Sequence, residues 1–304
     1  MKAVVTGGAG FIGSHLSDEL LKNGHEVILV DNLSSGSREN VKGPARLIQK
    51  DITKDELNAD FKDIDAVFHF AADPDVRSSA ENPKSSFDNN VIGTFRVLEA
   101  CRKNDIKRFV FASTSTVYGE VNAIPTPETY PCEPISNYGA SKLACEAYAS
   151  SYSHTYGIRS TVLRYANIFG PRSNHGVMFD FFEKLKEDQK RLEILGNGKQ
   201  EKSYLFVSDC IVATMAAFEK QQKVFDIYNV GSNEKHAVDE IANHVCRDLG
   251  LSPEFSYTGG NQGWAGDVKI MLLDVSKLRV LGWKPEIGLE KGVRSYLEWL
   301  KGVA

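Results

Sequence analysis

The sequence predicts an α/β fold in which a doubly wound parallel sheet is joined to a smaller, mixed α/β domain. Short apolar runs in the first half of the 304-residue chain are continuous rather than alternating, as expected for parallel strands covered on both faces. Amphipathic segments separate these runs, so strands and helices alternate as in right-handed βαβ units. A glycine-rich segment joins the first strand to the first helix, which indicates a tight turn there.

The expected elements follow one another from the N-terminus. Strands are predicted at residues 3–5, 26–30, 66–70, 109–112 and 160–163. The helices are predicted at residues 12–23, 85–104 and 138–156, and a last amphipathic helix at residues 289–301. After Gly170 the segments become shorter and glycine pairs mark the turns, so a second, smaller region is expected to begin there.

Composition excludes several function classes. The 36 basic and 40 acidic residues give a net charge of −4, which argues against nucleic-acid binding because phosphate backbones require a clustered basic face. No run of about 18 apolar residues is present, so no membrane-spanning helix is expected. The five cysteines include no C-x-x-C pair, and the seven histidines show no paired ligand spacing. We therefore expect free thiols in a reducing cytoplasm and no metal site.

The first candidate site is the glycine-rich segment at residues 6–13. Gly7, Gly10 and Gly13 permit a tight turn and let the backbone approach a pyrophosphate, although a ligand-free turn is the alternative. Asp31 ends the second strand 18 residues after Gly13, where a carboxylate accepts hydrogen bonds from an adenosine ribose. The same carboxylate would repel a 2′-phosphate, so the sequence predicts NAD rather than NADP.

The second candidate site combines a tyrosine and a lysine. If their segment is helical, Tyr138 and Lys142 share one face. A free tyrosine has a pKa of about 10, and a neighbouring ammonium lowers that pKa, so the pair is expected to move a proton to or from a sugar hydroxyl. Ser113 and Thr114 end an upstream strand, at the sheet edge where ligands bind. The alternatives are a surface ion pair and a Ser/Thr turn.

In combination, these segments resemble the extended short-chain dehydrogenase/reductase superfamily and, within it, the nucleotide-sugar epimerases. The resemblance covers essentially the whole chain. It rests on the glycine triplet and on motifs at residues 51–52, 69–72, 89–94, 113–119 (S-T-S-T-V-Y-G), 138–142 (Y-G-A-S-K), 164–167, 196–200 and 281–285.

The resemblance implies a role for each matched residue. Thr114 would hold the catalytic Ser/Thr position, Tyr138 would be the general base, and Lys142 would be its electrostatic partner. His69 is expected to be a packed strand-end residue rather than a ligand. The substrate-binding residues would be Thr114, Asn167, Val177, Leu195, Lys202, Asp267 and Met271. The NAD-binding residues would be Gly7, Gly10, Phe11, Ile12, Gly13, Asp31, Asn32, Asp51, Ile52, Phe70, Ala71, Ala72, Asn89, Ser113, Tyr138, Lys142 and Tyr165.

The resemblance also implies how the chain is divided. In relatives a strand–helix portion returns to the cofactor domain, and residues 206–230 are expected to do so here. The NAD-binding Rossmann domain would comprise residues 1–170 and 206–232, and the nucleotide-sugar-binding domain residues 171–205 and 233–304. Family members often dimerise through the helices near residues 85–104 and 138–156, so a homodimer is expected.

Comparison among branches of the family favours 4-epimerisation. Nucleotide-sugar 4,6-dehydratases carry an acid pair where this chain has Ser115 and Thr116, and uronate decarboxylases usually keep a glutamate at the second position. A hydroxyl cannot replace a carboxylate as a proton shuttle at neutral pH. Fucose-synthase-type enzymes tend to have a cysteine in this segment and use NADP, which Asp31 disfavours. We therefore expect a NAD-dependent 4-epimerase of a UDP-hexose that passes through a transient 4-keto sugar.

The substrate stays open at this point. A UDP-N-acetylhexosamine or UDP-glucuronate 4-epimerase would use the same chemistry, and a non-catalytic NAD-binding sensor is a remote alternative. Met271 falls where the family sets the size of the sugar pocket, so it would either admit an N-acetyl group or pack as a strand residue. A uronate would require a cation such as Arg77 or Arg172. Lys202 replaces a usual arginine, and another is missing before Gly266, so nucleotide recognition is expected to differ.

Overall fold

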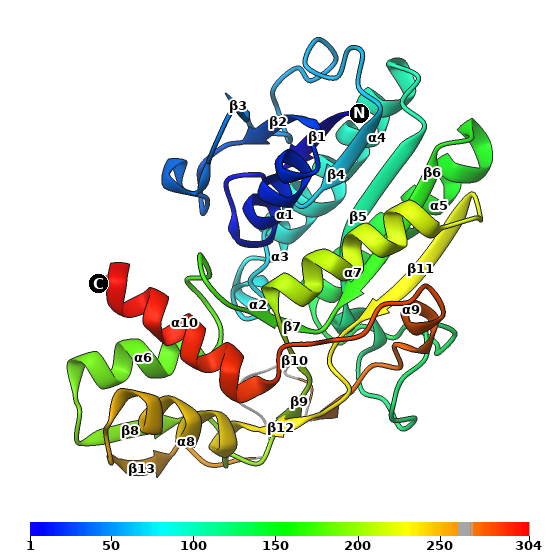
Figure 1. Ribbon diagram of the computed structural model, residues 1–304. Helices are drawn as coiled ribbons and strands as arrows, with labels where there is room; N and C mark the ends of the chain where they lie inside the picture. Colours follow the sequence, from blue (N-terminus) through cyan, green and yellow to red (C-terminus); the bar gives the residue numbers. More distant parts are fainter. Residues whose placement is uncertain (261–267, 269, 304) are drawn as a thin grey trace.

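The structure is a computed structural model that describes residues 1–260, 268 and 270–303. Its centre is a seven-stranded, fully parallel sheet in the order β11-β6-β5-β4-β1-β2-β3 (Figure 1). The strand order reverses between β1 and β4, so the sheet is doubly wound and Rossmann-like, as predicted. The strands are β1 (Lys2–Thr6), β2 (Glu26–Asp31), β3 (Arg46–Gln49), β4 (Ala66–His69), β5 (Arg108–Thr114), β6 (Arg159–Tyr165) and β11 (Phe225–Val230).

Helices cover both faces of this sheet, which explains its continuous apolar runs. Ala3 and Val5 of β1 share one hydrophobic core with two helices, α1 and α7, whereas Val4 enters the core beneath α4 and α5 on the opposite face. The difference arises because successive side chains of a strand point to opposite faces. These helices are α1 (Phe11–Lys22), α4 (Gly93–Lys103), α5 (Asn137–Tyr156) and α7 (Val207–Lys220).

The helix expected at residues 85–104 is divided into three parts. The short helix α3 (Pro83–Ser86) leads into a π-helical segment, η2 (Phe87–Ile92), and α4 follows it. Such π-turns often occur at functional sites. Here the buried Asn90 of η2 donates to the Ser141 hydroxyl at 2.9 Å, so the π-turn is bound to the start of α5.

A separate hydrophobic core lies at the other end of the molecule, in the lower left of Figure 1. Three helices (α6, α8 and α10) surround it together with strands β8 and β13, and Phe181, Val245 and Leu297 are among its buried members. The helices outside the sheet are α2 (Ser78–Glu81), α6 (Val177–Glu187), α8 (Val238–Leu249), α9 (Ser276–Val280) and α10 (Leu289–Val303), with short 3₁₀ turns at η1 (Arg38–Asn40) and η3 (Ser115–Tyr118). The strands outside the sheet are β7 (Asn167–Phe169), β8 (Arg191–Ile194), β9 (Glu201–Lys202), β10 (Tyr204–Phe206), β12 (His236–Ala237), β13 (Glu254–Tyr257) and β14 (Ile270–Met271).

The predicted strands correspond to β1, β2, β4, β5 and β6, except that β4 ends at His69, one residue before the predicted end. Within residues 206–230, which are expected to return to the cofactor domain, α7 packs on the sheet and β11 pairs with β6. None of the helices that the structure describes is long and apolar enough to cross a membrane.

Candidate active site

The glycine-rich loop lies at the carboxyl end of β1 and opens α1. Gly7 has a φ of +69°, and a Cβ on it would lie 2.6 Å from the backbone nitrogen of Ala71. A Cβ on Gly13 would collide with the carbonyl oxygen of Gly7, so both positions require glycine. Gly10 caps α1 without a side-chain hydrogen bond, and Phe11 and Ile12 form the first turn. The loop therefore offers a bare helix N-terminus, which fits the pyrophosphate of NAD.

Asp31 ends β2 directly beside this loop. Its carboxylate accepts hydrogen bonds from the backbone N–H of Ala9 at 2.9 Å and from that of Leu33 at 2.8 Å. These two donors fix the carboxylate at the loop, where the sequence predicts contact with the adenosine ribose. Asn32 follows in an exposed turn, in which its side-chain oxygen accepts from the Ser34 N–H at 3.0 Å.

The residues expected at the adenine lie next to one another after β3. Asp51 accepts from the Thr53 N–H and hydroxyl at 2.9 and 2.7 Å. Ile52 is buried, and its Cδ1 lies 2.7 Å from where a Cβ on Gly93 would be, so α4 packs closely on it. This geometry gives the predicted adenine site a polar side and an apolar side.

The segment after β4 lies at the carboxyl edge of the sheet, next to the glycine-rich loop. The N–H of Phe70 donates to the Thr6 carbonyl at 3.0 Å, Ala71 lies beside Gly7 of the glycine loop, and Ala72 follows it in the chain. The Phe70 ring stacks on that of Tyr165, with centroids 6.2 Å apart. Tyr165 is itself buried, and its hydroxyl pairs with Thr214 of α7 at 2.8 Å, so this hydroxyl faces the core instead of the cofactor edge.

The π-turn places Asn90 at the centre of the polar contacts within the protein, next to Asn89, which the resemblance assigns to NAD binding. Asn89 donates to the carbonyl and hydroxyl of Ser85 within its own turn, at 3.0 and 3.2 Å. Asn90 accepts from the Asp73 N–H at 2.8 Å and also binds Ser141. The motif at residues 89–94 contained both asparagines, and only the packing of α5 against η2 distinguishes them.

Thr114, Tyr138 and Lys142 meet at the carboxyl edge of the sheet. Thr114 ends β5, and its side chain lies close enough to Tyr138 to lower the pKa of the phenol. The Lys142 ammonium lies 5.9 Å from the centroid of the Tyr138 ring and donates to the Ala112 carbonyl at 2.9 Å. The predicted helical face is therefore confirmed, and it is oriented toward the end of β5.

The start of α5 explains how Tyr138 and Lys142 come close to the end of β5. The Ser136 hydroxyl caps the helix by accepting from the Gly139 N–H at 3.0 Å. A Cβ on Gly139 would lie 2.8 Å from the Thr116 carbonyl oxygen, so a larger residue would push α5 away from the segment that follows β5. The glycine of the Y-G-A-S-K motif therefore allows α5 to pack closely against the segment that follows β5.

The electrostatics of the pair differ from the expectation. Burial raises the pKa of Tyr138, and the hydrogen bond from Thr114 offsets this only in part. Burial also lowers the pKa of Lys142 to about 8, against the opposing influence of Cys145 and Glu146. The direction is thus opposite to the predicted lowering, because burial of the phenol outweighs the influence of Thr114.

The predicted substrate residues are spread over the second region. Asn167 of β7 donates through its side chain to the Ser203 carbonyl at 3.1 Å, and Val177 begins α6. Leu195 follows β8, and its carbonyl accepts from Gln200 at 3.2 Å. Lys202 and Met271 are register partners in β9 and β14, and Met271 is buried. Asp267 lies outside the described residues.

Ser113 and two other residues form a contact that the sequence did not predict. The Ser113 hydroxyl donates to Glu146 of α5 at 2.5 Å, so it faces the helix instead of the open edge. Glu146 in turn forms an ion pair with Arg164 of β6 at 2.6 Å. The arginine belonged to a recognised motif, but nothing in the spacing of these residues indicated that Glu146 would be its partner.

Comparisons with known proteins agree with this geometry. The model of the NAD dependent epimerase/dehydratase family matches residues 3–231. A putative UDP-glucose 4-epimerase of Methanocaldococcus jannaschii is 38% identical over 98% of this chain and 98% of its own. A solved UDP-galactose 4-epimerase is 46% identical, with a TM-score of 0.92, over 100% of this chain and 99% of its own.

Neighbours with a bound substrate are also similar. A crystal structure of UDP-glucose 4-epimerase with UDP-glucose from Thermotoga maritima is 36% identical, with a TM-score of 0.93, over 100% of this chain and 99% of its own. Other solved neighbours are described as 4-epimerases of UDP-N-acetylglucosamine and of UDP-glucuronic acid. These four solved neighbours are therefore all described as 4-epimerases of a UDP-sugar, and they differ in the sugar.

Proposed function

The chain belongs to the NAD-dependent epimerase/dehydratase family, and from this premise we propose that it interconverts UDP-glucose and UDP-galactose by 4-epimerisation. The observation that carries the proposal is the meeting of Thr114, Tyr138 and Lys142 at the carboxyl edge of the sheet. A proton-transfer group beside a dinucleotide loop is what oxidation and reduction of a sugar hydroxyl require. The intact trio also argues against a non-catalytic NAD-binding sensor.

The residues of the trio have distinct tasks in this reaction. NAD, when bound, would supply reversible hydride acceptance at C4 of the sugar. Tyr138, as the phenolate, takes the proton of the 4-hydroxyl, and Thr114 hydrogen-bonds to the same oxygen. Lys142 stabilises the phenolate electrostatically. The 4-keto sugar then turns about its diphosphate linkage, and Tyr138 returns the proton to the same oxygen.

Two cofactor-edge positions support epimerisation over elimination of water. Ser115 and Thr116 follow Thr114 in the turn η3, and Ser115 is buried there. The Thr116 hydroxyl lies 3.2 Å from that of Thr114, so it belongs to the same hydrogen-bonded group. Neither hydroxyl can donate and accept a proton as a carboxylic acid does at neutral pH, which disfavours the dehydratase reaction.

The two candidate cations leave open the choice between a neutral hexose and a uronate. Arg172 follows β7 and pairs through Nη2 with Asp18 of α1 at 2.6 Å, whereas its Nη1 is buried without a hydrogen-bond partner among the described residues. Arg172 therefore keeps a donor that a sugar carboxylate would accept. The other candidate, Arg77, is exposed at the start of α2. For an N-acetylhexosamine, the burial of Met271 leaves both of its predicted roles open, so substrate assays must decide.

The proposal is tested by incubating the purified protein with UDP-galactose, without added NAD, and separating the products by chromatography. Formation of UDP-glucose is expected. No product, even with added NAD, would exclude this substrate, and the same assay with UDP-N-acetylglucosamine and UDP-glucuronate would then test the rival sugars.

The Tyr138→Phe variant tests the catalytic assignment. We expect the variant to lose about 10²- to 10⁴-fold in kcat, because it lacks the group that carries the proton. NAD content, measured after denaturing the protein, should equal that of the wild type, since the hydroxyl is not needed to hold the cofactor. Wild-type turnover by the variant would contradict the assignment.

A further inference from the structure

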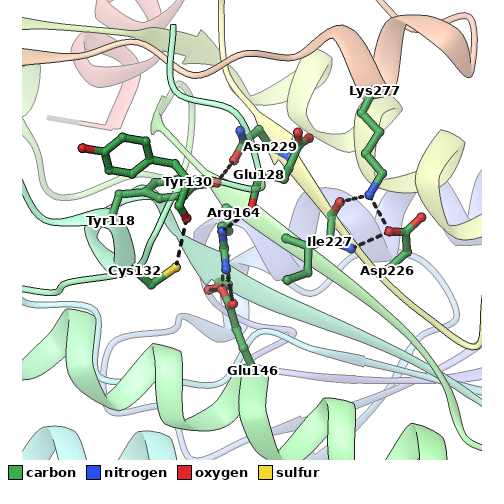
Figure 2. Close-up of polar contacts among 11 residues, drawn as sticks. Tyr118, Glu128, Tyr130, Cys132, Glu146, Arg164, Asp226, Ile227, Asn229 and Lys277 are labelled. Atoms are coloured by element: carbon green, nitrogen blue, oxygen red, sulfur yellow. Dashed lines mark hydrogen bonds and ion pairs between the residues drawn. The ribbon is translucent and has the colours of Figure 1, made fainter. Parts of the chain in front are cut away.

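Glu146 and Arg164 form a buried ion pair one helical turn after Lys142 on α5. The Arg164 guanidinium contacts both carboxylate oxygens of Glu146, with Nη2 to Oε2 at 2.6 Å and Nε to Oε1 at 3.0 Å (Figure 2). Each side chain is only 4% exposed. A charge buried this deeply strongly affects its neighbours, because little solvent screens it.

The surroundings of the pair hold it in one geometry. Ser113 donates to Glu146 at 2.5 Å, and Arg164 donates from Nη1 to the Glu128 carbonyl at 3.3 Å. The guanidinium also lies over the Tyr118 ring, 4.7 Å from its centroid. The pair thus joins α5, β5 and β6 and the loop that precedes α5.

Lys142 lies one helical turn before Glu146 on α5. The other groups that face the ammonium are Tyr138 and Cys145 on its own helix, His69 on β4, and the Phe111 ring and Ala112 carbonyl on β5. Burial keeps His69 neutral, and it raises the pKa of the Cys145 thiol. Glu146 is therefore the anion that competes with Tyr138 for the lysine charge.

Arg164 determines how strongly the charge of Glu146 acts on the Lys142 ammonium. With the arginine in place, the charge of Glu146 is compensated through a bidentate contact. Without it, the carboxylate would be buried and without a cationic partner, and the Lys142 ammonium, one turn away on the same helix, already feels its charge.

We propose that Arg164 is a positioning residue for proton transfer: it neutralises Glu146, so that the Lys142 ammonium acts on Tyr138 and the sugar oxygen instead of on the carboxylate behind it. This inference rests on the proposed function. It assigns no contact with substrate or NAD to Arg164, which acts only through Glu146 and Lys142.

The proposal predicts opposite effects of two single substitutions. Arg164→Met leaves Glu146 unpaired, which raises the pKa of Lys142 and moves the alkaline limb of the kcat profile to higher pH by about one unit. Glu146→Gln leaves the arginine unpaired, which lowers that pKa and moves the limb to lower pH. Both variants should lose about tenfold or more in kcat with KM little changed, because ground-state binding is untouched.

Three further variants complete the experiment. The double variant Glu146→Gln/Arg164→Met removes both charges and should return the limb to its wild-type position, since replacing a buried pair is better tolerated than breaking it. Arg164→Lys keeps the positive charge, so its alkaline limb should lie much closer to that of the wild type than the limb of Arg164→Met does. Lys277→Met breaks the other ion pair in Figure 2, with Asp226, and should leave the limb unchanged.

A second measurement does not depend on turnover. The folded-state pKa of Lys142 is about 8, below the usual 10.5, so the free energy of unfolding should rise between pH 8 and pH 10.5. Arg164→Met should flatten this rise and Glu146→Gln should steepen it. Shifts in the same direction, or none, would overturn the inference. If the wild type acts on no UDP-sugar but these stability shifts appear, the proposed function fails while the coupling holds.

Discussion

Among single residues, His69 shows how burial determines the role of a titratable side chain. It ends β4 beside the catalytic edge, and its ring nitrogens hydrogen-bond to the hydroxyls of Thr6 and Thr94 at 2.6 and 2.9 Å. Burial, together with the charge of Lys142, lowers the pKa of His69 to about 3. The ring therefore stays neutral and links β1, β4 and α4, as expected for a packed strand-end histidine.

This histidine should make the protein sensitive to acid. The unfolded chain binds a proton at His69 near pH 6.5 and the folded protein only near pH 3, so stability is lost as pH falls below 6.5. Between pH 7 and pH 5 the loss from this residue is about 2 kcal/mol. Urea unfolding at both pH values should show this loss in the wild type, and the His69→Gln variant should lack it. Equal losses in the two proteins would contradict the assignment.

Local spacing predicts some site residues but not their partners. Tyr138 and Lys142 were predictable because residues four apart share a helical face whatever the rest of the fold does. The contacts of Asn90 with Asp73 and Ser141 depend on a π-turn, which no simple periodicity indicates. The pairing of Glu146 with Arg164 depends on how α5 packs over β6, and this is a property of the tertiary structure.

Among the elements, the turn between β1 and α1 has the narrowest sequence requirement. Gly13 is buried in the first turn of α1, where its Cα lies against the carbonyl of Gly7. An added methyl group would force the loop open and move the helix N-terminus away from the pyrophosphate.

We expect Gly13→Ala to weaken NAD binding by about tenfold or more while leaving the fold intact, because the pyrophosphate loses its close backbone contacts. Isothermal titration calorimetry of the cofactor-free proteins would measure the change. Gly288→Ala is the matched control, since a Cβ there meets nothing within 4 Å, and it should bind NAD like the wild type. Unchanged affinity in Gly13→Ala would show that the loop does not hold the pyrophosphate.

Element length decides how well strands can be predicted. The buried strands β1, β2, β5 and β6 have five to seven residues and form continuous apolar runs. By contrast, β9, β12 and β14 have two residues each, too few to show any periodicity. They exist because neighbouring segments supply their hydrogen bonds.

For the whole molecule, the hydrophobic cores support the predicted division of the chain only in part, because Met271, Leu278 and Trp283 of the second region belong to the core that α1 and α7 share with the sheet. We propose that residues 171–205 and 233–304 form the nucleotide-sugar domain and that residues 1–170 and 206–232 form the NAD domain. The sheet has two cores, one on each face, and the third core is built by α6, α8, α10 and their strands. The third core is thus distinct from the two that hold the sheet, as the proposed nucleotide-sugar domain requires.

The surface of α4 and α5 carries the last prediction, which concerns assembly. Phe87, Phe95 and Tyr148 are 39–53% exposed on η2, α4 and α5, and the rings of Phe95 and Tyr148 lie 5.9 Å apart. Adjacent exposed aromatics indicate a protein–protein contact, so we expect a homodimer through this face. Phe95→Glu should convert the dimer to a monomer in light scattering, because it buries a charge in the contact. Val280→Glu, at an 86% exposed position on α9, should remain dimeric. A monomeric wild type, or a Phe95→Glu dimer, would contradict this interface.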